Sequence, residues 1–245
     1  MGKMYDSFNH ITGDFEEKVR KLTSGNSALI FTLKKVQGEP QVTTLMTKLD
    51  TIAAEMPGVE KTKFITRFSG IIPRSAQDYV QEYEDQFSAI LVEFLGWGWL
   101  KKRYTSLNPC FNHPNSPDLL VHNNDSEIVA CMECKYVRTS DENRCYFLGQ
   151  PRARNVNLLT LYSLNTSNNP FLRKLKDTLC NAEKQLKQIR AREKLIFLAL
   201  SLDMEYMPFG PDSLIKCLES DLSNKGIKLY AFEQFQVDSP ITGAV

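Results

Sequence analysis

The chain has no long apolar run and almost no net charge, and both absences restrict its function. It has 245 residues, of which 42% are hydrophobic, and its formal net charge is +1. No apolar stretch approaches the roughly 18 residues that a membrane-spanning helix needs, and the start, MGKMYDSFNH, lacks the apolar segment of a secretory signal. We therefore expect a cytoplasmic globular protein without a membrane partner. A nucleic-acid partner would have to be held by a local basic patch, because the chain has no overall positive field.

Cysteine is present, but without the spacing of a metal site or a disulfide framework. The six cysteines are irregularly spaced, and Cys131 and Cys134 form a single C-x2-C with no second pair. On a strand, an offset of three residues puts two side chains on opposite faces. We therefore expect free thiols, and neither a zinc site nor an iron–sulfur cluster.

The most informative stretch is SPDLLVHNNDSEIVACMECKYV, residues 116–137. A short apolar segment follows Asp118, and residues 123–126 are Asn, Asn, Asp and Ser, which favour turns because their side chains bond the local backbone. Residues 127–137 then supply β-branched and apolar side chains. The pattern predicts a β-hairpin, with Asp118 at the start of its first strand.

The expected register of this hairpin brings three charged residues together. If the loop has two or four residues, Asp118 lies opposite Cys131. Side chains alternate faces along a strand, so Glu133 and Lys135 then share the face of Asp118, and Glu133 is its diagonal neighbour. A three-residue loop would break this parity.

Two carboxylates and one ammonium on a shared face indicate a cation site. Like charges side by side raise each other's pKa and cost stability unless a cation neutralises them. Mg²⁺ prefers oxygen ligands and is held by one or two carboxylates, several waters and a substrate phosphate. The alternative is an exposed Asp, Glu and Lys on an ordinary hairpin. The apolar run before Glu133 argues against it, because that run is typical of a central strand, where unpaired charge is expensive.

The same residues carry a resemblance to a known superfamily. Pro117-Asp118, fourteen intervening residues and then Glu133-Cys134-Lys135 resemble the motif of the PD-(D/E)xK nucleases, which include many type II restriction endonucleases. The resemblance implies an α/β fold with a restriction-endonuclease-like core, in which helices flank a central mixed β-sheet.

The resemblance also implies a cofactor and roles for individual residues. The cofactor would be Mg²⁺, with Mn²⁺ as a substitute. Asp118, Glu133 and the backbone carbonyl of Cys134 would bind it, and Lys135 would position the attacking water. Glu93, on the first core helix, would be the ligand of a second ion, and its alternative is a solvated carboxylate on a surface helix.

The implied function is Mg²⁺-dependent hydrolysis of phosphodiester bonds in DNA by an endonuclease of the type II restriction kind. One alternative is another nuclease of the superfamily, such as a junction resolvase, a transposase subunit or a viral cap-snatching endonuclease. A second is a non-catalytic nucleic-acid-binding module, against which the intact Asp, Glu and Lys argue. A homodimer is compatible with duplex cleavage, because two cuts in a symmetric site favour a twofold-symmetric protein.

The remaining pattern predicts a helical N-terminal extension over residues 1–74 and a nuclease core over residues 75–245. The core is expected to begin with a helix over 75–95, which Gly96-Trp97-Gly98-Trp99 ends, followed by a strand over 99–106 and a loop over 107–116. After the hairpin we expect a helix over 170–192, a strand over 194–202, a helix over 212–222 and a strand over 227–232.

Four further residues are candidates for contacts with nucleic acid. Arg152 and Arg154 lie in a long polar insertion over 138–169, and long insertions are often functional. Lys184 and Gln185 lie on the basic helix that follows. The glutamine–tyrosine signature of the RecB-type branch of the superfamily is absent, because Ile189 occupies the later position. This departure disfavours that branch.

Overall fold

The structure, a computed structural model, describes residues 48–49, 51–70, 81–112, 116–138, 170–201, 211–233 and 238. The chain divides into two compact units, residues 1–111 and residues 112–245. The predicted boundary between residues 74 and 75 stays a prediction. Most of the predicted N-terminal extension lies outside the described residues. No helix in the described part of the chain has the length and apolar character that crossing a membrane requires.

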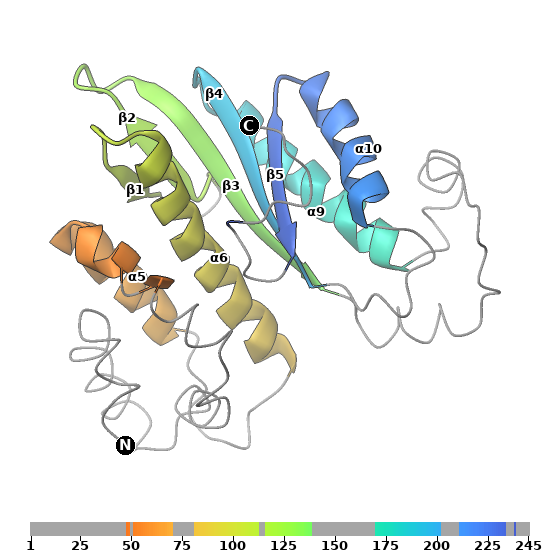
Figure 1. The fold of residues 1–245 in the computed structure, drawn as a ribbon, viewed down its shortest axis with the longest axis horizontal. Coiled ribbons are helices and arrows are strands. Elements are labelled where there is room, and N and C mark those ends of the chain that lie inside the picture. Colours follow the sequence, from red (N-terminus) through yellow and green to blue (C-terminus); the bar gives the residue numbers. More distant parts are fainter. Residues whose placement is uncertain are drawn as a thin grey trace. The chain divides into compact units, whose positions relative to one another are not determined.

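The N-terminal unit contains two long helices and one short strand. They are α5 (Gly58–Gly70), α6 (Gln81–Arg103) and β1 (Pro109–Phe111), drawn in orange, yellow and green in Figure 1. Its core includes stacked and tilted rings from each element, with the centroid of Phe64 4.2 Å from that of Phe94 and 6.2 Å from that of Phe111. The sequence pattern predicts helix within residues 1–74 but not the bounds of α5. Pro57 directly precedes the start of α5, where proline is well tolerated, and the N–H of Lys61 bonds its carbonyl at 2.9 Å.

Helix α6 continues through the glycine–tryptophan repeat, so the predicted helix end and the strand over 99–106 are both wrong. Gly98 lies against Ile52, and a Cβ at Gly98 would approach Cδ1 of Ile52 to 2.6 Å. Trp97 is fully buried, and its Nε1 donates a 2.7 Å hydrogen bond to the carbonyl of Pro109. These tertiary contacts outweigh the helix propensity that glycine forfeits, about 1 kcal/mol per residue. The first strand is β1 instead, within the segment expected to be a loop.

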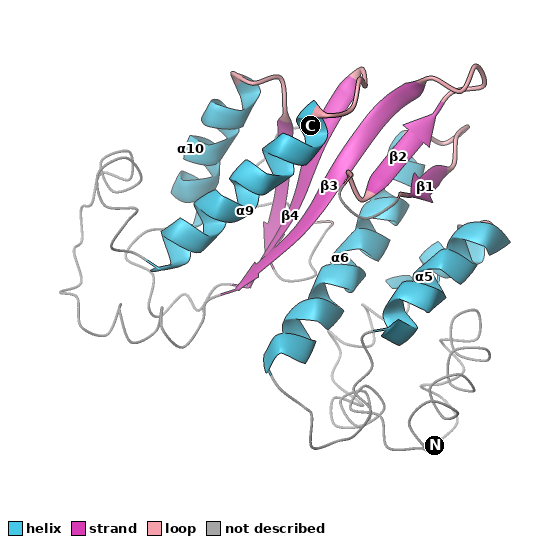
Figure 2. Cartoon of the chain, turned by 180° about the vertical axis from the view of Figure 1, so that it is seen from behind, coloured by secondary structure: helices cyan, strands magenta, loops and turns pink. Residues whose placement is uncertain are grey.

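The C-terminal unit is a mixed β-sheet with helices packed on it. The strands are β2 (Leu119–His122), β3 (Ile128–Arg138), β4 (Glu193–Ser201) and β5 (Lys228–Glu233), adjacent in this order. Strand β2 pairs with β3 antiparallel, whereas β3, β4 and β5 run parallel. Helix α9 (Pro170–Lys187) packs against β3 and β4, and α10 (Pro211–Ser223) packs against β5 (Figure 2). The predicted α/β class and mixed sheet are confirmed, and α9 ends at Lys187, five residues before the predicted end at residue 192.

The β2–β3 hairpin contains two irregularities that shift its register. The N–H of Asn123 bonds the carbonyl of Glu127 at 2.9 Å, which leaves a three-residue loop over 124–126, and Ser126 has a left-handed φ of 63°. Three-residue loops commonly end on such a residue. The register then shifts between Val121 and His122, because Val121 pairs with Ala130 and His122 pairs with Ile128. The extra residue, 129, forms a β-bulge.

The bulge restores the parity that the three-residue loop breaks. Leu119 pairs with Met132 and Leu120 with Cys131, so the predicted pairing of Asp118 with Cys131 is wrong by two residues. Extending the ladder by one residue places Asp118 directly opposite Glu133 and not diagonal to it. An even shift preserves the face of a side chain. The two carboxylates are therefore closer neighbours along the ladder than the sequence predicted.

Candidate active site

Asp118 lies immediately before β2, and its side chain is hydrogen-bonded to the backbone of β3. Its Oδ2 accepts a 2.8 Å hydrogen bond from the backbone N–H of Cys134. This bond takes the place of a ladder hydrogen bond where β2 has not yet begun, since β2 starts at Leu119. A carboxylate that accepts a backbone hydrogen bond is fixed in direction, so the side chain of Asp118 is held against the segment Glu133-Cys134-Lys135.

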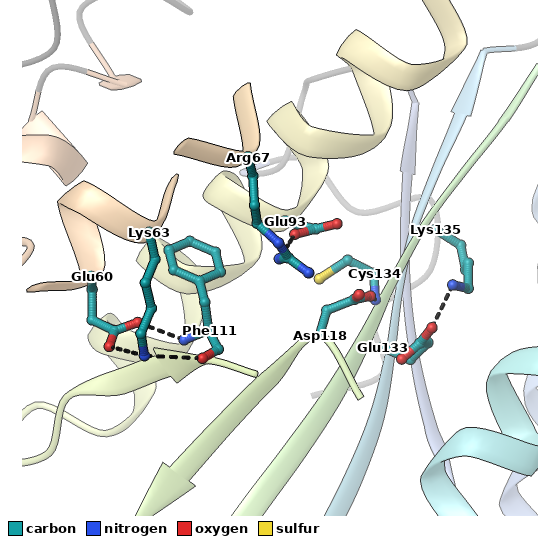
Figure 3. A network of polar contacts seen from close by, with 9 residues as sticks. All are labelled: Glu60, Lys63, Arg67, Glu93, Phe111, Asp118, Glu133, Cys134 and Lys135. Atoms are coloured by element: carbon teal, nitrogen blue, oxygen red, sulfur yellow. Dashed lines mark hydrogen bonds and ion pairs between the residues drawn. The ribbon is translucent and has the colours of Figure 1, made fainter. Parts of the chain in front are cut away.

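Glu133 is a buried carboxylate in the middle of β3. Its exposed fraction is 0%, and one oxygen, Oε1, forms an ion pair with Nζ of Lys135 (Figure 3). The other oxygen, Oε2, is buried without a hydrogen-bond partner, the single such side-chain atom in the described part of the chain. A buried carboxylate oxygen without a partner is costly, and in native proteins it indicates a missing proton, water or cation.

Charge and burial act together on the ionisation of this cluster. The pKa of Glu133 is raised from 4.5 to about 7, chiefly by burial and in addition by the charge of Asp118, while Lys135 opposes both. For Lys135, burial lowers the pKa, but the charges of Asp118 and Glu133 together outweigh burial and leave the pKa above its ordinary value. The three groups therefore lie close enough to influence one another, and Lys135 carries its proton at neutral pH. A charged lysine orients water and stabilises phosphate oxygens by donating hydrogen bonds, and it does not act as a base.

The carboxylate oxygens of this cluster suit a hard cation that takes only a few of its ligands from the protein. Within the described ranges, no group of three or more His, Cys, Asp and Glu side chains is placed to hold a metal ion. Mg²⁺ does not require such a group, because it is commonly bound by one or two carboxylates and completes its shell with water and phosphate oxygens. The unpartnered Oε2 of Glu133 beside Asp118 matches that requirement.

Two cysteines near the cluster are buried free thiols, Cys131 and Cys134. Burial raises the pKa of Cys131 to about 11, so this thiol keeps its proton at neutral pH and is a poor nucleophile there. The prediction of free thiols is confirmed for the five cysteines that the structure describes, while Cys145 lies outside the described residues.

Glu93 lies on α6, in the N-terminal unit, and its carboxylate is engaged there. Oε2 of Glu93 forms an ion pair with the guanidinium of Arg67 on α5, and the guanidinium carbon of Arg67 also lies 5.9 Å from the centre of the Phe111 ring. A cation at Glu93 would have to compete with this arginine. The role of Glu93 as a second metal ligand stays a prediction.

A second polar contact in the N-terminal unit was not foreseen. Oε2 of Glu60 accepts a 2.6 Å hydrogen bond from the N–H of Phe111, and Nζ of Lys63 donates a 3.2 Å bond to the carbonyl of the same residue (Figure 3). Oε1 of Glu60 also pairs with Nζ of Lys63 at 2.7 Å. Glu60, Lys63 and Arg67 follow the i, i+3, i+7 spacing of one helix face, and that spacing was the available signal.

The four predicted nucleic-acid contacts differ in their outcome. Lys184 is exposed on α9, and Gln185 beside it is half-buried. Arg152 and Arg154 lie outside the described residues. The position of Lys184 permits contact with a large partner, and its function stays a prediction.

Comparison with known proteins adds no family to this description. No protein-family model matches the chain, and neither the curated proteins nor the solved structures contain a match to it.

Proposed function

We propose that the chain is a Mg²⁺-dependent endonuclease that hydrolyses phosphodiester bonds in DNA, with a restriction-endonuclease-like core around β2 and β3. The observation that carries this proposal is the fully buried Glu133, on the strand position that faces Asp118. Its Oε1 pairs with the ammonium of Lys135, and its Oε2 has no hydrogen-bond partner. A buried unpaired oxygen is expensive to maintain for structure alone, and a bound cation would supply its partner.

The residues of the cluster would have distinct roles. Asp118 and Glu133 would hold the ion with carboxylate oxygens, with the carbonyl of Cys134 as a further donor. Bound Mg²⁺ would polarise the phosphate and lower the pKa of its water. Lys135 would donate hydrogen bonds to the attacking water and to the phosphate oxygens, because the neighbouring carboxylates keep it charged.

The arrangement of strands supports this proposal independently of the side chains. The acidic residue opposite Glu133 comes from the antiparallel neighbour β2, and the strand that carries Glu133 and Lys135 is central, with β4 parallel on its other side. Rigid strands position a site more accurately than loops do. The alternating spacing of Glu133 and Lys135 directs both side chains to one face of β3.

Cleavage of plasmid DNA tests the proposal. We expect supercoiled plasmid to be cut with Mg²⁺ or Mn²⁺, and activity to fall by at least about a hundredfold in Lys135→Ala and in Asp118→Asn, in the range typical of losing a positioned catalytic group. Asp125→Asn, in the exposed turn of the same hairpin, and Lys216→Ala, on the exposed side of α10, are matched controls that should retain activity.

The products separate the alternatives within the proposal. Discrete fragments would support restriction-type cleavage, and cutting confined to branched or single-stranded substrates would support another nuclease of the superfamily. Binding of DNA without cleavage under any divalent cation would support a non-catalytic module and contradict the proposed activity.

A further inference from the structure

Helix α9 presents a row of basic residues on the side turned away from the sheet. Its buried residues are Phe171, Leu172, Leu175, Leu179, Ala182 and Leu186, and they occupy one side of the helix. At 100° per residue, Arg173, Lys176, Lys184 and Lys187 fall within a sector of about 80°. The centre of this sector lies about 130° from the centre of the buried side, and Lys176, at its near edge, lies about 90° from it. All four are exposed, as is Cys180, which lies midway along the same sector. We call these five residues the basic row.

No acidic side chain among the described residues neutralises the middle of the basic row. Lys187 pairs with Glu183, and Glu183 also pairs with Lys225 in the turn after α10. Lys225 pairs in turn with Asp221 of α10, so those charges belong to a network that joins the two helices. Lys176 and Lys184 have no ion pair or hydrogen bond among the described residues. Asp177 is the one exposed acidic residue of α9. A charged face that is merely solvated need not carry an excess of one sign. The excess of basic over acidic side chains on the exposed side of α9 contrasts with the net charge of +1 for the whole chain.

The spacing of the row suits the backbone of a nucleic-acid duplex. The helical rise of 1.5 Å per residue places Lys176 and Lys184 about 12 Å apart along α9, which is about the width of the major groove of B-DNA. Proteins that hold single strands add aromatic side chains on which bases stack. The exposed residues of α9 include no aromatic residue, since its only one, Phe171, is buried. Contact with phosphates alone is therefore the chemistry that this face offers.

The basic row is also separate from the carboxylate cluster. The row lies on the solvent side and one flank of α9, and all its residues are exposed, whereas Glu133 is fully buried on β3. A duplex held there would not receive its catalytic contacts from these lysines.

We propose that the basic row of α9, centred on Lys176 and Lys184, is a docking surface for the phosphate backbone of duplex DNA. Contacts at this surface would strengthen the binding of DNA and would not depend on its base sequence. This inference rests on the proposed function for the nature of the partner.

The salt dependence of DNA binding tests the docking surface without any cleavage. The probe is a short random-sequence duplex labelled with a fluorophore, titrated in EDTA at several salt concentrations. Each phosphate contact contributes about 0.9 to the slope of log K against log salt. We expect the slope of Lys176→Ala/Lys184→Ala to fall by about 2 and its affinity to drop roughly 50-fold at about 0.1 M salt. Lys176→Arg/Lys184→Arg should retain the slope, and Lys216→Ala of α10 should leave it unchanged.

A chemical footprint gives a second reading of the same surface. Cys180 is exposed within the row, whereas Cys217 of α10 is half-buried and outside it. We expect duplex DNA to slow alkylation of Cys180, measured on the peptide that contains it, and not that of Cys217. The protection should vanish in the double alanine variant.

The outcomes distinguish this inference from the proposed function. An unchanged salt slope in the double alanine variant would overturn the docking surface, whether or not plasmid cleavage persists. An equal loss in Lys216→Ala would also overturn it, because the effect would then reflect total charge. Failure of the wild type to bind the duplex would overturn it as well. A wild type that cleaves no plasmid, but whose salt slope falls in the double alanine variant, would contradict only the proposed activity.

Discussion

The backbone N–H of Cys134 donates a 2.8 Å hydrogen bond to Oδ2 of Asp118, a residue sixteen positions earlier in the chain. This bond joins the end of the loop before β2 to the middle of the candidate motif. It gives Asp118 a structural role that is separate from any role in cation binding.

We expect Asp118→Ala to be less stable than Asp118→Asn. Alanine leaves the N–H of Cys134 without its acceptor, whereas asparagine retains an acceptor oxygen. Loss of a hydrogen bond to a charged acceptor costs about 1.5–3 kcal/mol. Urea unfolding of both variants measures the difference, and equal stabilities would show that the hydrogen bond makes no net contribution.

We expect the stability of the protein to fall as pH rises from about 4.5 to about 7. Because burial raises the pKa of Glu133 to about 7, the folded state keeps this proton over a range in which the unfolded state has lost it. The unfolded state then binds fewer protons, and the unfolding free energy decreases with pH, by up to about 3 kcal/mol in total. Urea unfolding across this range, without divalent cations, should show a steeper decrease in the wild type than in Glu133→Gln. Parallel curves would contradict the assignment.

We expect Gly98→Ala to be destabilising even though alanine favours helices. A Cβ at Gly98 would lie 2.6 Å from two side-chain carbons of Ile52, so one of the two residues must move. Overpacking of this kind costs about 1–3 kcal/mol. Ile52→Val removes Cδ1 and should recover part of the loss, so the two substitutions should show a coupling energy in a double-mutant cycle. Additive effects would indicate that the two residues are not in contact.

We expect Glu60→Ala to destabilise the N-terminal unit more than Lys63→Ala does. Glu60 is 7% exposed and accepts the hydrogen bond of a buried N–H, that of Phe111, whereas Lys63 donates to a carbonyl and is more exposed. Leaving a buried N–H unsatisfied costs about 1–3 kcal/mol. Thermal unfolding should therefore separate the two variants by several degrees. The reverse order would show that the ammonium contributes more.

The parts of the site that were predictable from sequence are those set by short-range rules. Alternation along a strand puts Glu133 and Lys135 on one face wherever the strand lies, and the turn formers at residues 123–126 mark the hairpin. The register was not predictable, because it depends on a three-residue loop and on a bulge that restores the side-chain alternation which that loop breaks. The length of α6 was also missed, since it depends on the packing of Gly98 against Ile52, a contact distant in sequence.

The remaining differences have the same origin. The ion pair between Arg67 and Glu93 joins residues on separate helices, and the bounds of α5 were not predicted. Propensity predicts a helix end at Gly96-Trp97-Gly98-Trp99, while burial of the Trp97 ring favours continuation. The mixed sheet was implied by the family resemblance. The strands predicted from apolar runs over 194–202 and 227–232 match β4 and β5 to within one residue at each end.

The bulge at residue 129 decides which residue of β3 faces Asp118. Shortening the turn to two residues would leave Asn123 paired with Glu127 and Asp118 opposite Glu133. Pairing residue 129 within the ladder would instead put Asp118 opposite Met132 and turn its side chain away from that of Glu133. One unpaired residue of β3, and not the length of the turn, therefore keeps the two carboxylates on one face.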